Sequence, residues 1–126
     1  MSMKISIGFD HGAIPLRAPL LEHLSACGHD LVDHGTDSTE SVDYPDYADL
    51  VCEDVVKGRV EVGILCCTTG IGMSIAANKI KGIRAATIKF EDEAALTRQH
   101  NNANVLCLGA HHTTPYEAVR LADVFL

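Results

Sequence analysis

Short apolar runs alternate with amphipathic segments from one end of the chain to the other. Five of the runs have the length and composition of strands, and each is followed by a segment whose apolar residues repeat at helical spacing. The predicted strands are residues 4–9, 30–33, 60–65, 85–88 and 105–109. The predicted helices are residues 16–24, 47–55, 72–79 and 91–100, and a last helix that Pro115 opens. Strands that alternate with helices predict an α/β domain with a parallel sheet and right-handed crossovers.

Polar residues gather where several of the predicted strands end. Asp10 and His11 follow the first strand, residues 67–72 follow the third, and His111 and His112 follow the fifth. Ligands of such sheets bind beyond the carboxyl ends of the strands, so we expect a site at that edge.

The bulk composition limits the classes of partner. A chain of 126 residues has the length of one domain, which we expect to span residues 1–126. Its net charge of −7 argues against a nucleic-acid or membrane partner, although backbone amides can still attract a small anion. Five cysteines without regular spacing do not form a disulfide framework, and no apolar run is long enough for a signal region or a membrane helix. These features predict a cytoplasmic protein with free thiols.

The segment Thr68-Thr-Gly-Ile-Gly72 follows a predicted strand and opens a predicted helix, the setting of many phosphate and oxyanion sites. It is not a Walker loop, because no Gly-Lys-Ser/Thr follows, and it is not a dinucleotide fingerprint, because position 75 is Ile. Every α/β domain also needs turns between strands and helices. The residues alone therefore leave both an anion cradle and a simple turn open.

Cys66 and Cys67 lie where the third strand meets this loop. A cysteine acts as a base only as the thiolate, which a helix N-terminus favours. Successive side chains of a strand point to opposite faces, so at most one of the two thiols faces the loop, and Cys67 is nearer to it. Cys66 is expected to be a small buried residue, as are three further cysteines in helix or strand patterns, Cys27, Cys52 and Cys107. Adjacent cysteines form only a strained disulfide, which argues against a redox role for the pair.

Histidines near the ends of elements offer proton transfer close to neutral pH. Asp10-His11 and His100-Asn101 are polar pairs that suit proton exchange and sugar-hydroxyl binding, although an exposed histidine is more often only solvated.

The adjacent pair His111-His112 raises the question of a metal. Neighbouring side chains rarely converge on one ion, and no Cys-x-x-Cys or His-x-x-x-His motif accompanies the pair. We therefore expect no metal site.

Five stretches of the chain share one family pattern: residues 8–11, 43–45, 63–79, 82–85 and 98–105. The longest reads Gly-Ile-Leu-Cys-Cys-Thr-Thr-Gly-Ile-Gly-Met-Ser-Ile-Ala-Ala-Asn-Lys. In one uninterrupted register they resemble the ribose-5-phosphate isomerase B family, which includes the galactose-6-phosphate isomerase subunits. The resemblance implies a three-layer αβα Rossmann-like domain with a five-stranded parallel sheet. It also implies active sites shared across a homodimer, dimers that often pair into tetramers, and no metal or organic cofactor.

The same resemblance implies an aldose–ketose isomerase of the pentose phosphate pathway, which interconverts ribose 5-phosphate and ribulose 5-phosphate through a cis-enediolate. By their places in the family pattern, Cys67 is expected to be the base, Thr69 to help move the hydroxyl proton, and His100 to open the furanose ring. The residues expected to bind the sugar phosphate are Asp10, His11, Tyr44, Gly70, Ile71, Gly72, Ser74, Asn101 and His111.

Three departures from the family pattern concern the substrate. Thr68 stands where the family usually has glycine, and His111 stands where an arginine is usual. The sequence also stops at Leu126, whereas relatives usually continue into a tail with arginines that reach a partner's phosphate. With fewer arginines to bind phosphate, two alternatives stay open. One is an isomerase of another short or hexose sugar, and the other is a non-catalytic partner subunit of a hetero-oligomeric isomerase.

Overall fold

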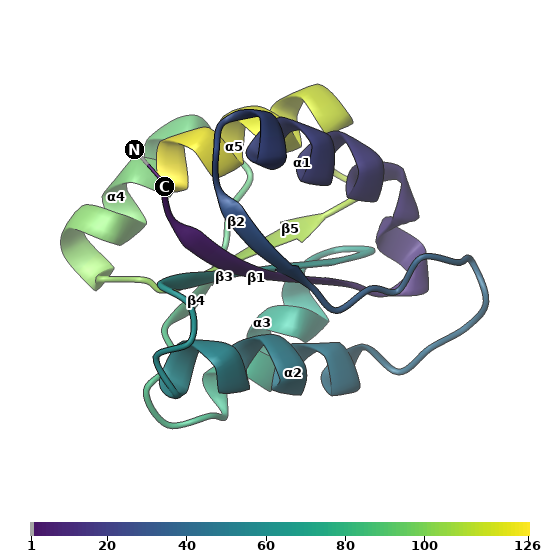
Figure 1. The fold of residues 1–126 in the computed structure, drawn as a ribbon, viewed down its shortest axis with the longest axis horizontal. Helices are drawn as coiled ribbons and strands as arrows, with labels where there is room; N and C mark the ends of the chain where they lie inside the picture. Colours follow the sequence, from purple (N-terminus) through teal and green to yellow (C-terminus); the bar gives the residue numbers. More distant parts are fainter. Residues whose placement is uncertain (1) are drawn as a thin grey trace.

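A computed structural model of the protein describes residues 2–126 and alternates strands with helices throughout (Figure 1). The strands are β1 (Lys4–Phe9), β2 (Asp30–Asp33), β3 (Val62–Cys67), β4 (Ala85–Thr87) and β5 (Val105–Gly109). The helices are the short 3-10 helix η1 (His11–Ala13) and the α-helices α1 (Ile14–Ala26), α2 (Tyr44–Val56), α3 (Ile71–Asn78), α4 (Glu91–Asn101) and α5 (Pro115–Phe125).

The strands form one parallel sheet in the order β2-β1-β3-β5-β4. Helices α1, α4 and α5 cover one face of the sheet, and α2 and α3 cover the other (Figure 1). This layering confirms the αβα Rossmann-like domain expected from the sequence. None of the helices in residues 2–126 combines the length and the apolar character needed to cross a lipid bilayer.

Strand β3 lies at the centre of the sheet, and all six of its residues are buried. Its side chains alternate between the two layers of helices, as the pleat of a strand requires. Ile64 and Cys66 pack with α1 and α5, whereas Leu65 and Cys67 pack with α2 and α3. The alternation therefore separates the two adjacent cysteines onto opposite faces of the sheet.

Three local expectations need correction. The helix expected at residues 47–55 begins three residues earlier, at Tyr44, because its first turn tolerates Pro45. The third strand begins and ends two residues later than expected, at Val62 and Cys67, and so includes both cysteines. Cys27 is exposed rather than buried, because α1 ends at Ala26 and leaves Cys27 at its C-cap.

Asp54 of α2 is a buried carboxylate that ties this helix to the sheet. It accepts hydrogen bonds from Ser6 Oγ at 2.8 Å, His34 Nε2 at 2.6 Å and Arg59 Nη1 at 3.1 Å. Burial alone would raise the pKa of Asp54, but the hydrogen bonds from His34, Ser6 and Arg59 outweigh burial and lower the pKa below its ordinary value.

Asp54 is expected to make the fold sensitive to acid. Because its pKa is lower in the folded than in the unfolded chain, its stabilising effect is complete above about pH 4 and is lost as the pH falls through the folded pKa. Asp54→Asn should cost about 1–3 kcal/mol of unfolding free energy at neutral pH. In urea unfolding, the variant should also lose less stability than the wild type between about pH 5 and pH 3. Asp49→Asn, at an exposed position of the same helix, is the control, and equal losses in both variants would contradict the role of Asp54.

Candidate active site

A cleft opens where β1 and β3 end at the carboxyl edge of the sheet. The chain continues from β1 to β2, which lies on one side of β1, whereas β3 lies on the other side of β1. The strand order therefore reverses at this point, and α/β domains commonly bind ligands at such a reversal. The cleft has a volume of about 220 Å³. Its lining residues are Asp10, Tyr44, Cys67, Thr68, Thr69 and Gly72. Five of these six are residues that the sequence predicted for the site.

Cys67 and Cys66 differ sharply in their surroundings. Cys67 is 5% exposed, lines the cleft, and its Sγ accepts a hydrogen bond from the Gly70 N–H at 3.1 Å. Cys66 lies wholly within the core, and burial raises the pKa of its thiol well above the ordinary value, as it does for Cys107. Burial also raises the pKa of Cys52 to about 12. Among these four cysteines, only Cys67 meets the cleft.

The loop between β3 and α3 is held tightly against the end of β5. Gly70 has a φ of +81°, a left-handed conformation that glycine adopts without strain, and its carbonyl accepts a hydrogen bond from Thr87 Oγ1 at 3.3 Å. Gly109 lies so close beneath Thr69 that a Cβ on Gly109 would collide with the Thr69 carbonyl group. The Ala110 N–H donates to the Cys67 carbonyl at 3.0 Å and the His111 N–H to the Thr68 carbonyl at 2.9 Å. The loop geometry therefore depends on β5.

The first turn of α3 presents two uncommitted amides. The Gly70 N–H donates to Cys67 Sγ, and the Ile71 N–H donates to Thr69 Oγ1 at 3.2 Å. Within residues 2–126, no acceptor is found for the N–H groups of Gly72 and Met73. The first amides of a helix lack partners inside the helix and suit an anion. The sequence suggested the amides of residues 70–72 for this role, but the loop itself uses those of Gly70 and Ile71. Gly72 keeps its amide available, and Met73, which was not predicted, adds a second.

Asp10 forms the wall of the cleft opposite α3. The residue is 6% exposed, and its Oδ1 accepts a hydrogen bond from the Gly12 N–H at 2.9 Å. Burial raises the pKa of the Asp10 carboxyl above its ordinary value, and the Gly12 amide offsets this only in part. A carboxyl in this position can accept hydrogen bonds from the hydroxyls of a sugar.

Tyr44 lines the cleft from the first turn of α2, and His11 contacts the loop that precedes this helix. The ring of Tyr44 lies over Gly72, with its Cζ 2.8 Å from where a Cβ on Gly72 would be. The Val42 N–H donates to Nδ1 of His11 at 3.1 Å. Since Nδ1 accepts this bond, the neutral imidazole of His11 carries its proton on Nε2, which is then a donor for a ligand.

Thr68 is the one lining residue that departs from the family pattern. Its hydroxyl lies against Gly12, so close that a Cβ on Gly12 would collide with Thr68 Oγ1. The Thr68 side chain thus occupies space between the end of β1 and the end of β3 that a glycine at position 68 would leave empty.

Seven of the twelve predicted residues are not among those that line the cleft. His11, Gly70 and Ile71 directly adjoin lining residues in the chain, whereas the other four do not. His111 lines a neighbouring hollow of about 330 Å³ between the starts of α1 and α5. Ser74 lies further along α3, where it accepts a hydrogen bond from Asn78 at 3.4 Å. His100 and Asn101 end α4 at the opposite, amino edge of the sheet. Shortly after α4, the Asn104 carbonyl accepts a hydrogen bond from the Gly63 N–H at the beginning of β3, which fixes this end of α4 at the amino edge.

A family model described as Ribose/Galactose Isomerase matches residues 5–126, nearly the whole chain. The chain belongs to this family. The family recognised from the sequence motifs is thereby confirmed, and so is the expectation of an isomerase.

Solved structures of the family have the same fold. A ribose 5-phosphate isomerase from Thermotoga maritima superposes with a TM-score of 0.95 at 46% identity, over 98% of this chain and 85% of its own. Ribose-5-phosphate isomerase B from Mycoplasma genitalium, solved with bound ribulose-5-phosphate, superposes with a TM-score of 0.92 at 43% identity, over 97% of this chain and 82% of its own. Ribose-5-phosphate isomerase B from Escherichia coli is 43% identical over 98% of this chain and 83% of the relative.

Proposed function

We propose that the chain interconverts ribose 5-phosphate and ribulose 5-phosphate. The observation that carries the proposal is the position of Cys67, whose sulfur lines a cleft beside the uncommitted amides of α3. Relatives named ribose-5-phosphate isomerase B align over nearly the whole of this chain, and one of them was solved with bound ribulose-5-phosphate.

In the proposed reaction, Cys67 as thiolate removes the proton from C2 of the open-chain aldose and returns a proton to C1. The electron pair of the broken C–H bond forms the enediol double bond, and the carbonyl oxygen at C1 takes up negative charge. The amides of Gly72 and Met73 donate to this charge. Thr69 Oγ1 moves the proton between the two oxygens of the cis-enediolate, so that the product carbonyl forms at C2.

We propose that a second copy of the chain completes the site. His100, expected to open the furanose ring, and Asn101, expected to hold hydroxyls, end α4 at the edge of the sheet away from the cleft. Both side chains are exposed there. In a homodimer with the carboxyl edge of one sheet beside the amino edge of the other, each cleft receives these residues from the partner. In this arrangement Asp10 and Tyr44 hold the remaining hydroxyls, and His11 donates to the phosphate through Nε2.

The proposed activity is tested with a panel of ribose 5-phosphate, ribose and galactose 6-phosphate, each assayed for aldose–ketose conversion by the purified chain. The expected result is the highest kcat/KM for ribose 5-phosphate. A higher value for galactose 6-phosphate would transfer the proposal to a hexose phosphate. Binding of sugar phosphates without turnover, until a second chain is added, would indicate a partner subunit instead.

Thr68 is expected to limit the length of the sugar. Because its side chain fills space beside Gly12, Thr68→Gly should raise kcat/KM for a hexose phosphate relative to ribose 5-phosphate by about tenfold or more. Thr68→Ser, which keeps the hydroxyl, is the matched control and should change the ratio less. A ratio that stays constant across the wild type and both variants would contradict a role of Thr68 in selectivity.

His111 is expected to contribute to phosphate binding in place of the usual arginine. Removing its imidazole should therefore weaken phosphate binding, so competitive inhibition by inorganic phosphate should be weaker in His111→Gln than in the wild type. His112→Gln is the control and should be inhibited as the wild type is. Equal inhibition of all three proteins would remove His111 from the phosphate site.

A further inference from the structure

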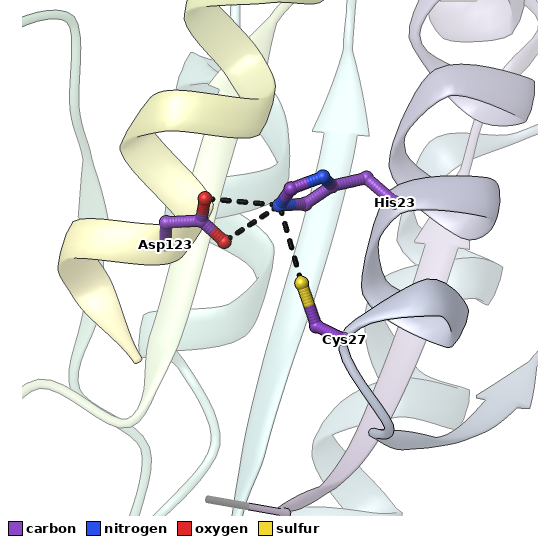
Figure 2. A group of neighbouring side chains, drawn as sticks. All are labelled: His23, Cys27 and Asp123. Atoms are coloured by element: carbon purple, nitrogen blue, oxygen red, sulfur yellow. Dashed lines mark hydrogen bonds and ion pairs between the residues drawn. The ribbon is translucent and has the colours of Figure 1, made fainter.

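Three side chains of different chemistry converge between α1 and α5 (Figure 2). His23 Nε2 lies 2.8 and 2.9 Å from the two carboxylate oxygens of Asp123 and 3.5 Å from Cys27 Sγ. One ligand atom from each residue lies within 4.8 Å of both others. This His23–Cys27–Asp123 cluster takes no part in the reaction proposed above.

The packing of two helices preforms the cluster. His23 and Cys27 are separated by one helical turn, so they share one side of the end of α1. Asp123 comes from α5, which packs against α1 through Leu20, Leu24 and other residues of one core cluster. Just after Cys27, the Gly28 carbonyl accepts a hydrogen bond from Ser2 Oγ, and His29 Nδ1 accepts one from the Met3 N–H. Ser2 and Met3 directly precede β1, so the cluster lies at the amino edge of the sheet, opposite the Cys67 cleft.

The arrangement is not that of a catalytic relay. In a nucleophile–histidine–carboxylate relay, the nucleophile and the carboxylate use different ring nitrogens, because the histidine must pass a proton between the nucleophile and the substrate. Here the thiol and the carboxylate both face Nε2 (Figure 2). Three ligand atoms gathered around one point are instead the arrangement expected around a metal ion.

We propose that His23, Cys27 and Asp123 bind a divalent transition metal of the zinc class. Imidazole nitrogen, thiolate sulfur and carboxylate oxygen are all zinc ligands, and a thiolate among them disfavours magnesium and calcium. On binding, the Cys27 thiol releases its proton to solvent and the sulfur becomes a ligand. Water takes the fourth position, since the three protein ligands lie partly open to solvent.

One separation of ligand atoms already matches a tetrahedral zinc site, and the other two, which lie within 4.8 Å, must adjust to it. With ordinary bond lengths, ligand atoms in such a site lie about 3.4–3.6 Å apart. The separation of His23 Nε2 from Cys27 Sγ, 3.5 Å, already fits. The histidine–carboxylate separation of 2.8 Å must open by roughly 0.6 Å, which small side-chain rotations supply because 31% of the His23 and 40% of the Asp123 side chain are exposed.

A bound ion would join the end of α1 to α5. Apart from the His23–Asp123 hydrogen bonds, these helices meet through apolar side chains, so the metal would replace a hydrogen-bonded contact at their rim with a coordinated cross-link. The expected consequence is a chain whose resistance to heat rises when zinc is added.

The proposal is tested by titrating Co²⁺ into the full chain after treatment with a chelator. The expected result is saturable binding of one equivalent with a sulfur-to-cobalt absorption band in the near ultraviolet, which Zn²⁺ then abolishes. His23→Gln, Cys27→Ser and Asp123→Asn should each weaken binding by roughly tenfold or more. Glu22→Gln, which removes a carboxylate from an exposed position of α1 and leaves all three ligands in place, should bind as the wild type does.

Thermal unfolding of the same proteins separates metal binding from a structural effect. Zinc should raise the unfolding temperature of the wild type and of Glu22→Gln, and should not raise it in the three ligand variants. An absorption band that persists in Cys27→Ser would overturn the proposal, because the thiolate would then come from another cysteine. The absence of saturable binding to the wild type, or equal affinity in all the variants, would overturn it as well.

Discussion

Cys67→Ala is expected to lower kcat for ribose 5-phosphate isomerisation by about 10²–10⁴-fold, the usual contribution of a general base. We expect this loss because the Cys67 sulfur lines the cleft, where the hydrogen bond from the Gly70 amide holds it. KM should change little, since the residues proposed to hold the sugar and its phosphate remain. Ribulose 5-phosphate formation is measured at saturating substrate, with circular dichroism to establish that the variant is folded.

Cys66→Ala is the matched control, because it removes the same atoms from the adjacent residue on the other face of the sheet. The buried Cys66 packs with α1 and α5, so this variant should lose stability but keep its kcat. Equal turnover by the wild type and Cys67→Ala, or an equal loss of turnover in both variants, would remove Cys67 as the base.

Gly109→Ala is expected to damage both activity and stability, although residue 109 belongs to the core strand β5 and not to the cleft. Its new methyl group would collide with the Thr69 carbonyl carbon and oxygen and lie 2.7 Å from the Thr69 Cα, all of them backbone atoms that cannot rotate away. The loop that carries Cys67 and Thr69 must shift. A displacement of about 1 Å at reacting groups costs about 100-fold in rate, and overpacking costs about 1–3 kcal/mol of unfolding free energy.

Gly58→Ala separates this contact from the general effect of replacing a glycine. Gly58 has a φ of +72°, but no atom lies within 4 Å of the position that a Cβ would take, so alanine there meets backbone strain alone. Its kcat/KM should match that of the wild type, whereas that of Gly109→Ala should fall. Kinetics and urea unfolding of both variants provide the measurement, and full activity in Gly109→Ala would contradict the dependence of the loop on β5.

The apolar pattern predicted the fold well because the three inner strands, β1, β3 and β5, are buried over nearly their whole length. The run predicted at residues 60–65 is nearly continuously apolar, which is typical of a central strand covered on both faces, and β3 lies at the centre of the sheet, at residues 62–67. Helix boundaries were less predictable. The start of α2 at Tyr44 was missed because Pro45 indicates a turn as readily as the first turn of a helix.

The candidate site could be predicted only as far as it depends on neighbours in sequence. The strand alternation and the following helix were enough to prefer Cys67 to Cys66. The availability of the Met73 amide depends on which amides the loop itself uses, and the role of Gly109 depends on contact between two strand ends. The His23–Cys27–Asp123 cluster was invisible because Asp123 lies 100 residues from His23.

The sheet order also determines how early in its synthesis the protein can become active. Strand β5 lies between β3 and β4, so β4 leaves the ribosome before the only strand with which it pairs. Until residues 105–109 emerge, the edge of β3 stays open and the loop after Cys67 lacks its hydrogen bonds from Ala110 and His111. A nascent chain that ends before β5 therefore contains Cys67 and the whole glycine loop but not the support that shapes them. Arrival of the last strand completes the sheet and supports the loop after Cys67 in a single event.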